Sequence, residues 1–408
     1  MKSTLRVAGL LAVLAVGPGC AAPISGTAKP GLTPVDLASL KTGAQITEPT
    51  EFKERFPSST SERIRLIEGR RLLNVLVPPM DFQPSATELG YTRIFANPEA
   101  MSKTGGIPAQ YNQAIATNNL VVGVSASRTN GSVRTPESAL IGILQFATEQ
   151  DAKNAAAAMF QVTMSGATPR HPASIPDYPN ANASSADDAS VNAFQQHGPF
   201  VVTTAVLQST PDLTGLAGKI KQALDKQLPA LDQFKIVAPD DLMDLPRDQD
   251  GIVRRTMGKS PAGDPYGMSF YDEDSGTFLP SGILHYERDP ATARKAFEEA
   301  GVDLIGRRYS TVYRARDVEA AFKLQTALAK PGKDDAELDS PPGIADARCL
   351  RLGEADKNRN YNGICVLVYD RYVAVVMSLT SVSKSSLQSD PVLHERTAAQ
   401  YVILKKSE

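Results

Sequence analysis

The sequence LIGILQFATEQDAKNAAAAMF, at residues 140–160, predicts a strand that leads directly into a helix. Residues 140–147 are apolar on both faces, which is typical of a strand in the centre of a sheet. Thr148 can cap the helix, with Asp151 three residues later. A buried strand followed by an amphipathic helix indicates mixed α and β structure. The apolar stripe of this helix consists of Ala152, Ala155, Ala156, Met159 and Phe160.

A similar pattern recurs in the second half of the chain. Thr311–Ala315 precedes a helix that opens at Asp317, as residues 143–147 precede the first helix, 168 residues earlier. In the same way, Phe200–Thr203 corresponds to Tyr372–Val375, 172 residues later. This nearly constant spacing predicts two copies of one domain. The alternative is coincidence, because strand–helix–strand order is common.

Local signals predict the other helices and strands. Further helices are expected from Ser61 to the stop at Pro78-Pro79, from Asp212 to Pro229, and from Asp289-Pro290 to Gly301. Further strands are expected at Leu120–Ala126, Phe200–Leu207, Ile283–Tyr286, Tyr309–Arg314, Ile364–Tyr369 and Tyr372–Leu379. Asp370-Arg371 is expected to form the two-residue turn of a hairpin. The Pro-, Asn- and Ser-rich residues 165–190 are expected to form a long surface loop.

The order of these elements predicts an α+β fold with two related plait-like, ferredoxin-like domains. The first domain is expected over residues 61–235 and the second over residues 265–408. Residues 236–264 carry several Asp residues with Pro261 and Gly263, and they are expected to form a linker.

The N-terminus has the organisation of an export signal. Lys2 and Arg6 precede an apolar run, Val7–Val16, which is too short to span a membrane. Residues 1–19 are therefore expected to be a lipoprotein signal peptide that ends before Cys20, the predicted lipidation site. Residues 20–60 are expected to form a flexible tether. Ordinary cleavage after Ala22, or a plain signal anchor with a free Cys20, are the alternatives.

The stretch Val16-Gly17-Pro18-Gly19-Cys20 resembles the signal of bacterial lipoproteins. With the tether Ser25-Gly26-Thr27-Ala28 and the helix Ile67-Glu68-Gly69-Arg70-Arg71, the chain resembles actinobacterial cell-envelope lipoproteins of an uncharacterised tandem-domain family. The resemblance implies a compartment and an architecture, and it implies no activity. It places the protein on the outer face of the plasma membrane, attached through lipid.

The composition excludes some partners. The chain has 408 residues, with 43 basic and 45 acidic side chains and a net charge of −2, so no nucleic-acid partner is expected. Three Cys residues are too few for a disulfide-rich miniature protein. The four His residues have no metal-binding spacing, so neither a metal nor a cofactor is expected.

Cys349 and Cys365 are expected to form a disulfide bond. If residues 347–352 and 364–369 are antiparallel neighbours, the two thiols lie opposite each other, with Lys357 at the midpoint of the connection. An exported protein oxidises such a pair. Two buried free thiols are the alternative.

No group of residues forms a complete catalytic motif. Ser381-Val382-Ser383-Lys384, Lys103-Thr104-Gly105 and Ser190-Val191-Asn192 match elements of serine penicillin-binding enzymes, but in reversed order along the chain. The turns at residues 248–251 and 358–363 resemble calcium loops but lack essential acidic positions. Tyr309, Tyr313, Tyr369 and Tyr372 indicate either an aromatic binding face or, more simply, core packing.

These observations favour a non-catalytic envelope lipoprotein that binds a ligand or an envelope protein, with the crevice between the two halves as a candidate position. Two alternatives remain open. One is a secreted hydrolase whose site is assembled only in three dimensions. The other is the solute-binding lipoprotein of a transporter, a class built from two α/β lobes joined by hinge strands.

Overall fold

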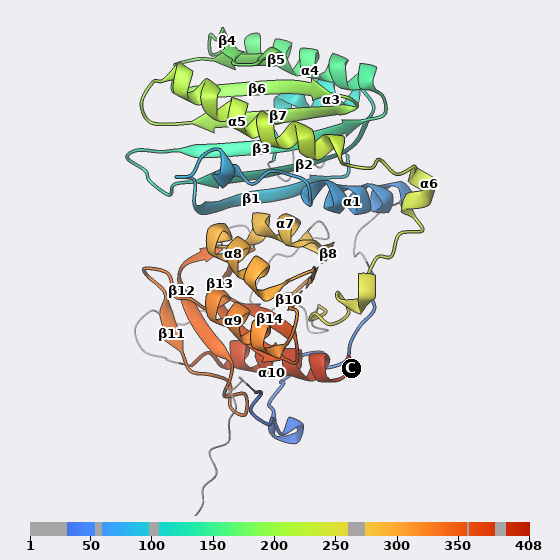
Figure 1. The fold of residues 1–408 in the computed structure, drawn as a ribbon, viewed down its shortest axis with the longest axis vertical. Helices are drawn as coiled ribbons and strands as arrows, with labels where there is room; N and C mark the ends of the chain where they lie inside the picture. Colours follow the sequence, from blue (N-terminus) through green and yellow to red (C-terminus); the bar gives the residue numbers. More distant parts are fainter. Residues whose placement is uncertain (1–30, 54–58, 98–105, 260–273, 357–358, 380–388) are drawn as a thin grey trace, which may run out of the picture.

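The chain folds into two α+β domains, each built on one seven-stranded antiparallel sheet (Figure 1). The computed structural model describes residues 31–53, 59–97, 106–259, 274–356, 359–379 and 389–408. The strand order is β1-β2-β3-β7-β6-β5-β4 in the first sheet and β11-β12-β13-β14-β10-β9-β8 in the second. Among the described residues, no helix has the length and apolar character needed to cross a membrane.

The N-terminal domain begins with α1 and ends with α5. Its helices are α1 (Thr60–Leu73), α3 (Asn112–Ala116), α4 (Glu149–Met164) and α5 (Leu213–Asp232), with 3₁₀ turns η2 (Pro79–Asp81) and η3 (Ala109–Tyr111). Its strands are β1 (Glu88–Phe95), β2 (Leu120–Thr129), β3 (Ser138–Phe146), β4 (His171–Ile175), β5 (Tyr178–Ser185), β6 (Ser190–His197) and β7 (Phe200–Leu207).

The C-terminal domain follows a connection that contains α6 (Pro239–Leu242) and the 3₁₀ turn η4 (Gln249–Gly251). Its helices are α7 (Pro280–Ile283), α8 (Pro290–Ala300), α9 (Val318–Leu328) and α10 (Pro391–Lys405), with the 3₁₀ turn η6 (Leu284–Tyr286). Its strands are β8 (Gly276–Phe278), β9 (Leu304–Arg307), β10 (Ser310–Arg314), β11 (Ala336–Leu338), β12 (Arg348–Asp356), β13 (Tyr361–Tyr369) and β14 (Tyr372–Ser378).

The two domains repeat one plan, as the sequence spacing predicts. In both, the strands are connected in the same way and the sheet order is the same when the second sheet is read from β8 to β11. In each domain, the two strands that belong to the sequence repeat are antiparallel neighbours. β3 pairs with β7 in the first domain, and β10 pairs with β14 in the second. The four-stranded ferredoxin-like plait is not confirmed, because each sheet contains seven strands and β4 to β7 follow one another as a meander.

Both sheets are covered by helices on both faces. In the first sheet, Ile143 packs with α1 and α5, whereas the next residue, Leu144, packs with α3 and α4. In the second sheet, Val366 packs with α8 and α9, whereas its neighbour Cys365 packs with α10. Because successive side chains of a strand point to opposite faces, a strand that is covered on both sides buries apolar residues at consecutive positions, as β3 does from Ile143 to Leu144.

Most of the predicted helix starts are confirmed by capping contacts. The Thr148 hydroxyl accepts a hydrogen bond from the Asp151 N–H, and Asp212, Asp289 and Asp317 cap α5, α8 and α9 in the same way. Gly301 ends α8 in the left-handed conformation, with φ +59°. Tyr369 and Tyr372 are paired across the predicted two-residue turn.

Three local predictions are wrong. Residues 165–190 include β4 and β5, which extend the sheet, instead of forming a long loop. Residues 283–286 are helical instead of a strand, because Pro280 starts a helix and the run is buried on all sides at the domain boundary. α5 passes through Pro229 and ends at Asp232, because Leu231 packs into the core and holds the last turn.

The predicted tether and linker also need correction. Residues 31–53, here called the strap, lie along the C-terminal domain instead of hanging free (Figure 1). Thr33 donates hydrogen bonds to Asp346, and Phe52 is 4% exposed in the core beneath α10. Ile252, Val253 and Met257, which were expected in the linker, are buried in the same core. Apolar residues of the strap and of the predicted linker, which show no helical or strand periodicity, thus form part of the core of the C-terminal domain.

Candidate functional site

A cavity of about 540 Å³ lies where the strap meets the connection between the two domains. One wall comes from residues 49–52 of the strap, and the other comes from residues 247–254, which include η4. Charged side chains dominate the lining. The lining residues are Pro49, Glu51, Phe52, Arg247, Asp248, Asp250, Gly251 and Arg254.

Arg308 connects the two walls of the cavity. Its guanidinium donates to the Thr50 hydroxyl at 3.1 Å and to the carbonyl groups of Val253 and Thr256 at 3.0 and 2.8 Å. The side chain is buried, and burial lowers the pKa of Arg308 to about 10, with Asp248 opposing this effect. Arg308 therefore links the strap to the second wall, and the two walls of the cavity form one unit.

The second wall is a tight turn with two consecutive left-handed residues. Asp250 has φ +52° and Gly251 has φ +64°. The Asp248 carboxylate stabilises this turn, because its two oxygens accept hydrogen bonds from the N–H groups of Val253 and Arg254 at 2.5 and 2.9 Å. The sequence resemblance of residues 248–251 to a calcium loop is therefore explained by a backbone turn. Within the described residues, no group of three or more His, Cys, Asp or Glu side chains is placed to hold a metal ion.

The charges in the cavity differ in how far they are compensated. Asp250 accepts from Arg314 at 2.8 Å, and Glu51 pairs with Lys53 at 3.0 Å. Over the parts of the chain that the structure describes, the side chains of Arg247 and Arg254 form no hydrogen bond or ion pair. The lining contains no Ser, Cys, His or Lys, so these residues offer carboxylates and guanidinium groups for binding but no nucleophile with its base.

The sequence favours the crevice between the two halves as a candidate binding position. In the structure, α7 and η6 fill this space. Thr92 of β1 donates to the carbonyl of His285 at 2.8 Å, and Arg128 of β2 donates to the carbonyl groups of Leu284 and Glu287 at 3.3 and 2.5 Å. Burial lowers the pKa of Arg128 to about 10. Apolar side chains of both domains join in one core across this boundary. The predicted binding position between the halves is therefore occupied by α7 and η6, which connect the two domains directly.

His285 is the one histidine at this boundary. It is 2% exposed, and its ε nitrogen lies 3.0 Å from the Leu76 carbonyl. Burial, reinforced by the positive charge of Arg128, lowers the pKa of His285 to about 4. The imidazole is therefore neutral at pH 7 and serves as a buried hydrogen-bonding group between the domains.

A second buried polar cluster lies close by in the C-terminal domain. The guanidinium groups of Arg307 and Arg359 each lie 4.8 Å from the ring centre of Tyr286. Arg359 is 1% exposed and forms ion pairs with Asp274 and Asp356 at 3.0 and 3.1 Å. This buried cluster therefore joins separate segments of the C-terminal domain.

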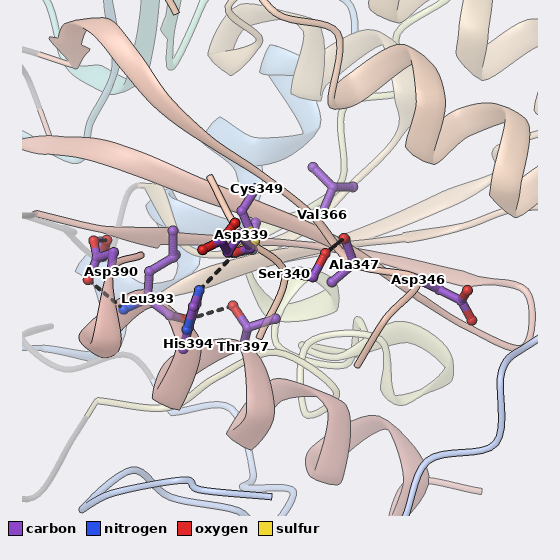
Figure 2. Close-up of a disulfide and its surroundings, with 12 residues drawn as sticks. Asp339, Ser340, Asp346, Ala347, Cys349, Val366, Asp390, Leu393, His394 and Thr397 are labelled. Carbon is purple, nitrogen blue, oxygen red and sulfur yellow. Dashed lines mark hydrogen bonds between the residues drawn. A yellow bond between two sulfur atoms is a disulfide. The ribbon is translucent and has the colours of Figure 1, made fainter. Parts of the chain in front are cut away.

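The predicted disulfide bond is confirmed. Cys349 and Cys365 are direct partners in the β12–β13 ladder and are bonded to each other. Both are buried on the face of the sheet that α10 covers (Figure 2). On the neighbouring helix, the His394 imidazole lies 2.9 Å from the Asp339 carbonyl, beside the strand that leads to Cys349. The predicted lipidation site, Cys20, and the predicted signal peptide, residues 1–19, lie outside the described residues.

Where they are described, the other residues that the sequence singled out have structural roles. Ser381–Lys384 and Lys103–Gly105 lie outside the described residues, and the Ser190 hydroxyl on β6 donates to Asp187. Tyr313 is 2% exposed and donates to Glu287 at 2.6 Å, so it belongs to the core. Tyr369 packs edge-on against Tyr401 beneath α10, also as a core contact.

Comparison with known proteins gives the relationship of the chain. Residues 56–247 match the profile described as "Domain of unknown function (DUF7373) N-terminal", and residues 252–407 match the one described as "Domain of unknown function (DUF7373) C-terminal". The chain belongs to the DUF7373 family. The two DUF7373 regions in tandem correspond to the two domains described above, and the cavity lies at the point where one region ends and the next begins.

Other comparisons add little. No curated protein matches the chain. Among solved structures, the extracellular domain of PknH from Mycobacterium tuberculosis is similar at 8% identity and a TM-score of 0.28, covering 39% of this chain and 95% of that chain. A similarity at this level carries no argument about the fold or function of the DUF7373 chain.

Proposed function

We propose that this protein is exported, is anchored by lipid on Cys20 to the outer face of the plasma membrane, and binds a ligand or envelope protein without catalysing a reaction. The observation that carries the binding proposal is the cavity between the strap and residues 247–254, with its charged lining. The Cys349–Cys365 bond supports export, because disulfide bonds persist in oxidising compartments. The lipoprotein-like sequence at residues 16–20 supports the anchor and a place in the cell envelope.

The strap gives the proposed anchor a structural consequence. Residues 21–30 would connect the lipid to the strap, whose Thr33 is bound to Asp346 of the C-terminal domain. An extended chain spans at most about 3.6 Å per residue, so Thr33 would lie within roughly 47 Å of Cys20. The C-terminal domain would therefore be tethered to the membrane through the strap, within this distance.

The alternatives receive less support from the described residues. A hydrolase needs a nucleophile, a base and oxyanion donors that converge in a cleft, and the cavity lining supplies none of these as a set. A solute-binding lipoprotein needs two lobes that close by a hinge. Buried hydrogen bonds of Thr92 and Arg128 across the boundary oppose such a motion.

The anchor is tested by metabolic labelling with an alkyne analogue of palmitate. We expect label on the wild-type chain and none on Cys20→Ala, with Cys349→Ala as the control that keeps the label. Label on Cys20→Ala would overturn the lipid anchor. Binding is tested by native mass spectrometry of the protein extracted gently from its own envelope, where a bound molecule or protein is expected. Turnover of an envelope polymer by the purified protein would overturn the non-catalytic assignment.

A further inference from the structure

The geometry points to an anion site in this cavity: we propose that Arg247 and Arg254 bind a carboxylate or phosphate group of a small ligand. The inference rests on the proposed binding function and specifies the chemistry of its ligand. It depends on which charges in the cavity are already satisfied and which remain available.

Each acidic group of the lining already has a partner within the protein. Asp248 uses both carboxylate oxygens on the N–H groups of its own turn. Asp250 pairs with Arg314, which is 14% exposed and fixed by further contacts to Asp303. Glu51 pairs with Lys53 at 3.0 Å, and both side chains are more than 70% exposed. A cation entering the cavity would therefore compete with existing partners for each of these acids.

The two arginines of the lining have no such partners among the described residues. Arg254 is exposed, but its side chain lies against the turn, because a Cβ atom at Gly251 would be 2.7 Å from its ε nitrogen. Its side chain therefore crosses the surface of the turn at a position where Gly251 leaves space. Arg247 is half-buried at the start of the same segment. Gly251 is needed both for its φ of +64° and for this close approach.

Guanidinium groups favour planar oxyanions. Each arginine presents a fork of N–H donors that matches a carboxylate or phosphate and forms two parallel hydrogen bonds with it. Pro49 on the opposite wall provides apolar surface for the rest of the ligand, next to Phe52, whose side chain is largely buried. A cavity of about 540 Å³ has the size of a small-molecule site. The ligand is therefore expected to be a small organic anion with a compact apolar part.

Binding can be measured by isothermal titration of the exported chain carrying Cys20→Ser, which removes only the proposed lipid site. The probes are inorganic phosphate in one series and citrate in another, at low ionic strength. We expect at least one probe to bind at a single site, and Arg247→Gln/Arg254→Gln to weaken it at least tenfold. Arg254→Lys keeps the charge without the fork and should lose part of the affinity. The control is Arg134→Gln, because Arg134 is exposed in the other domain.

Each outcome decides the inference. A preference for phosphate identifies a phosphate ester as the ligand class, and a preference for citrate identifies a carboxylate. No binding of either probe would overturn the inference, as would equal losses in Arg134→Gln and in the double variant. The proposed function is tested separately, because an uncharged molecule or a protein found by native mass spectrometry would support binding while refuting an anion site.

Discussion

Removing the Cys349–Cys365 bond should destabilise the C-terminal domain by about 3 kcal/mol. The bond closes a loop between residues that are 16 positions apart and directly opposed in the β12–β13 ladder. The chain-entropy account attributes the effect to the unfolded state, which gains freedom when the loop opens. In a domain of this size, each kcal/mol shifts the unfolding midpoint by roughly 2–4 °C, so the expected loss is roughly 6–12 °C.

The assay compares oxidised wild type, reduced wild type and Cys349→Ala/Cys365→Ala by calorimetry, with the redox state of each sample checked by mass spectrometry. Reduced wild type should unfold at a lower temperature than oxidised wild type, and the reductant should not change the double variant. The reduced sample keeps both sulfur atoms in the core, so it separates loop closure from packing. If oxidised and reduced wild type unfold at the same temperature, the stabilising role of the bond is refuted.

Three further predictions concern the contacts that join the domains and the strap. Arg128→Met should lower the free energy of unfolding by roughly 3 kcal/mol, because carbonyl groups at the domain boundary lose their hydrogen-bond donor. Arg134 is exposed, so Arg134→Met should change the free energy of unfolding by less than about 0.5 kcal/mol. Urea unfolding measures both values. The pKa of His285 is lowered to about 4 in the folded protein, so the unfolded chain binds the proton more readily. The free energy of unfolding should therefore be highest above pH 6.5 and fall by roughly 3 kcal/mol as the pH drops from 6.5 to 4. An equally steep pH dependence in His285→Gln would contradict that assignment. Phe52→Ala should cost about 3–5 kcal/mol, against a small effect for Leu37→Ala, which is 38% exposed; equal effects would show that the strap is not anchored by Phe52.

Elements with complete local signals could be predicted from the sequence. Asp289, Pro290 and Gly301 supply the cap, the first turn and the end of α8, and the structure shows all three in these roles. The Cys349–Cys365 bond could be predicted because the two cysteines lie on neighbouring predicted strands at equal distances from residue 357. The β12–β13 ladder pairs them directly, although its register shifts between Arg351 and Asp356. In each case the deciding information lies within about twenty residues of sequence.

Elements fixed by distant contacts could not be predicted. β4 contains Pro172 and lies at the edge of its sheet, the position where proline is tolerated in a strand. The strap has no periodic pattern, and its contact between Thr50 and Arg308 joins residues 258 positions apart. The cavity also depends on contacts between residues that are far apart in the sequence. Residues 248–251 could be recognised as a turn, but no local pattern indicates that the strap lies against them.

The most direct test of the account is mass spectrometry of the intact protein extracted from its own cells without reduction. The account predicts a chain that begins at Cys20, carries the mass of a lipid on that residue, and contains the bridged Cys349–Cys365 peptide pair. A chain that still begins at Met1 and carries three free thiols would contradict export, the anchor and the proposed role together.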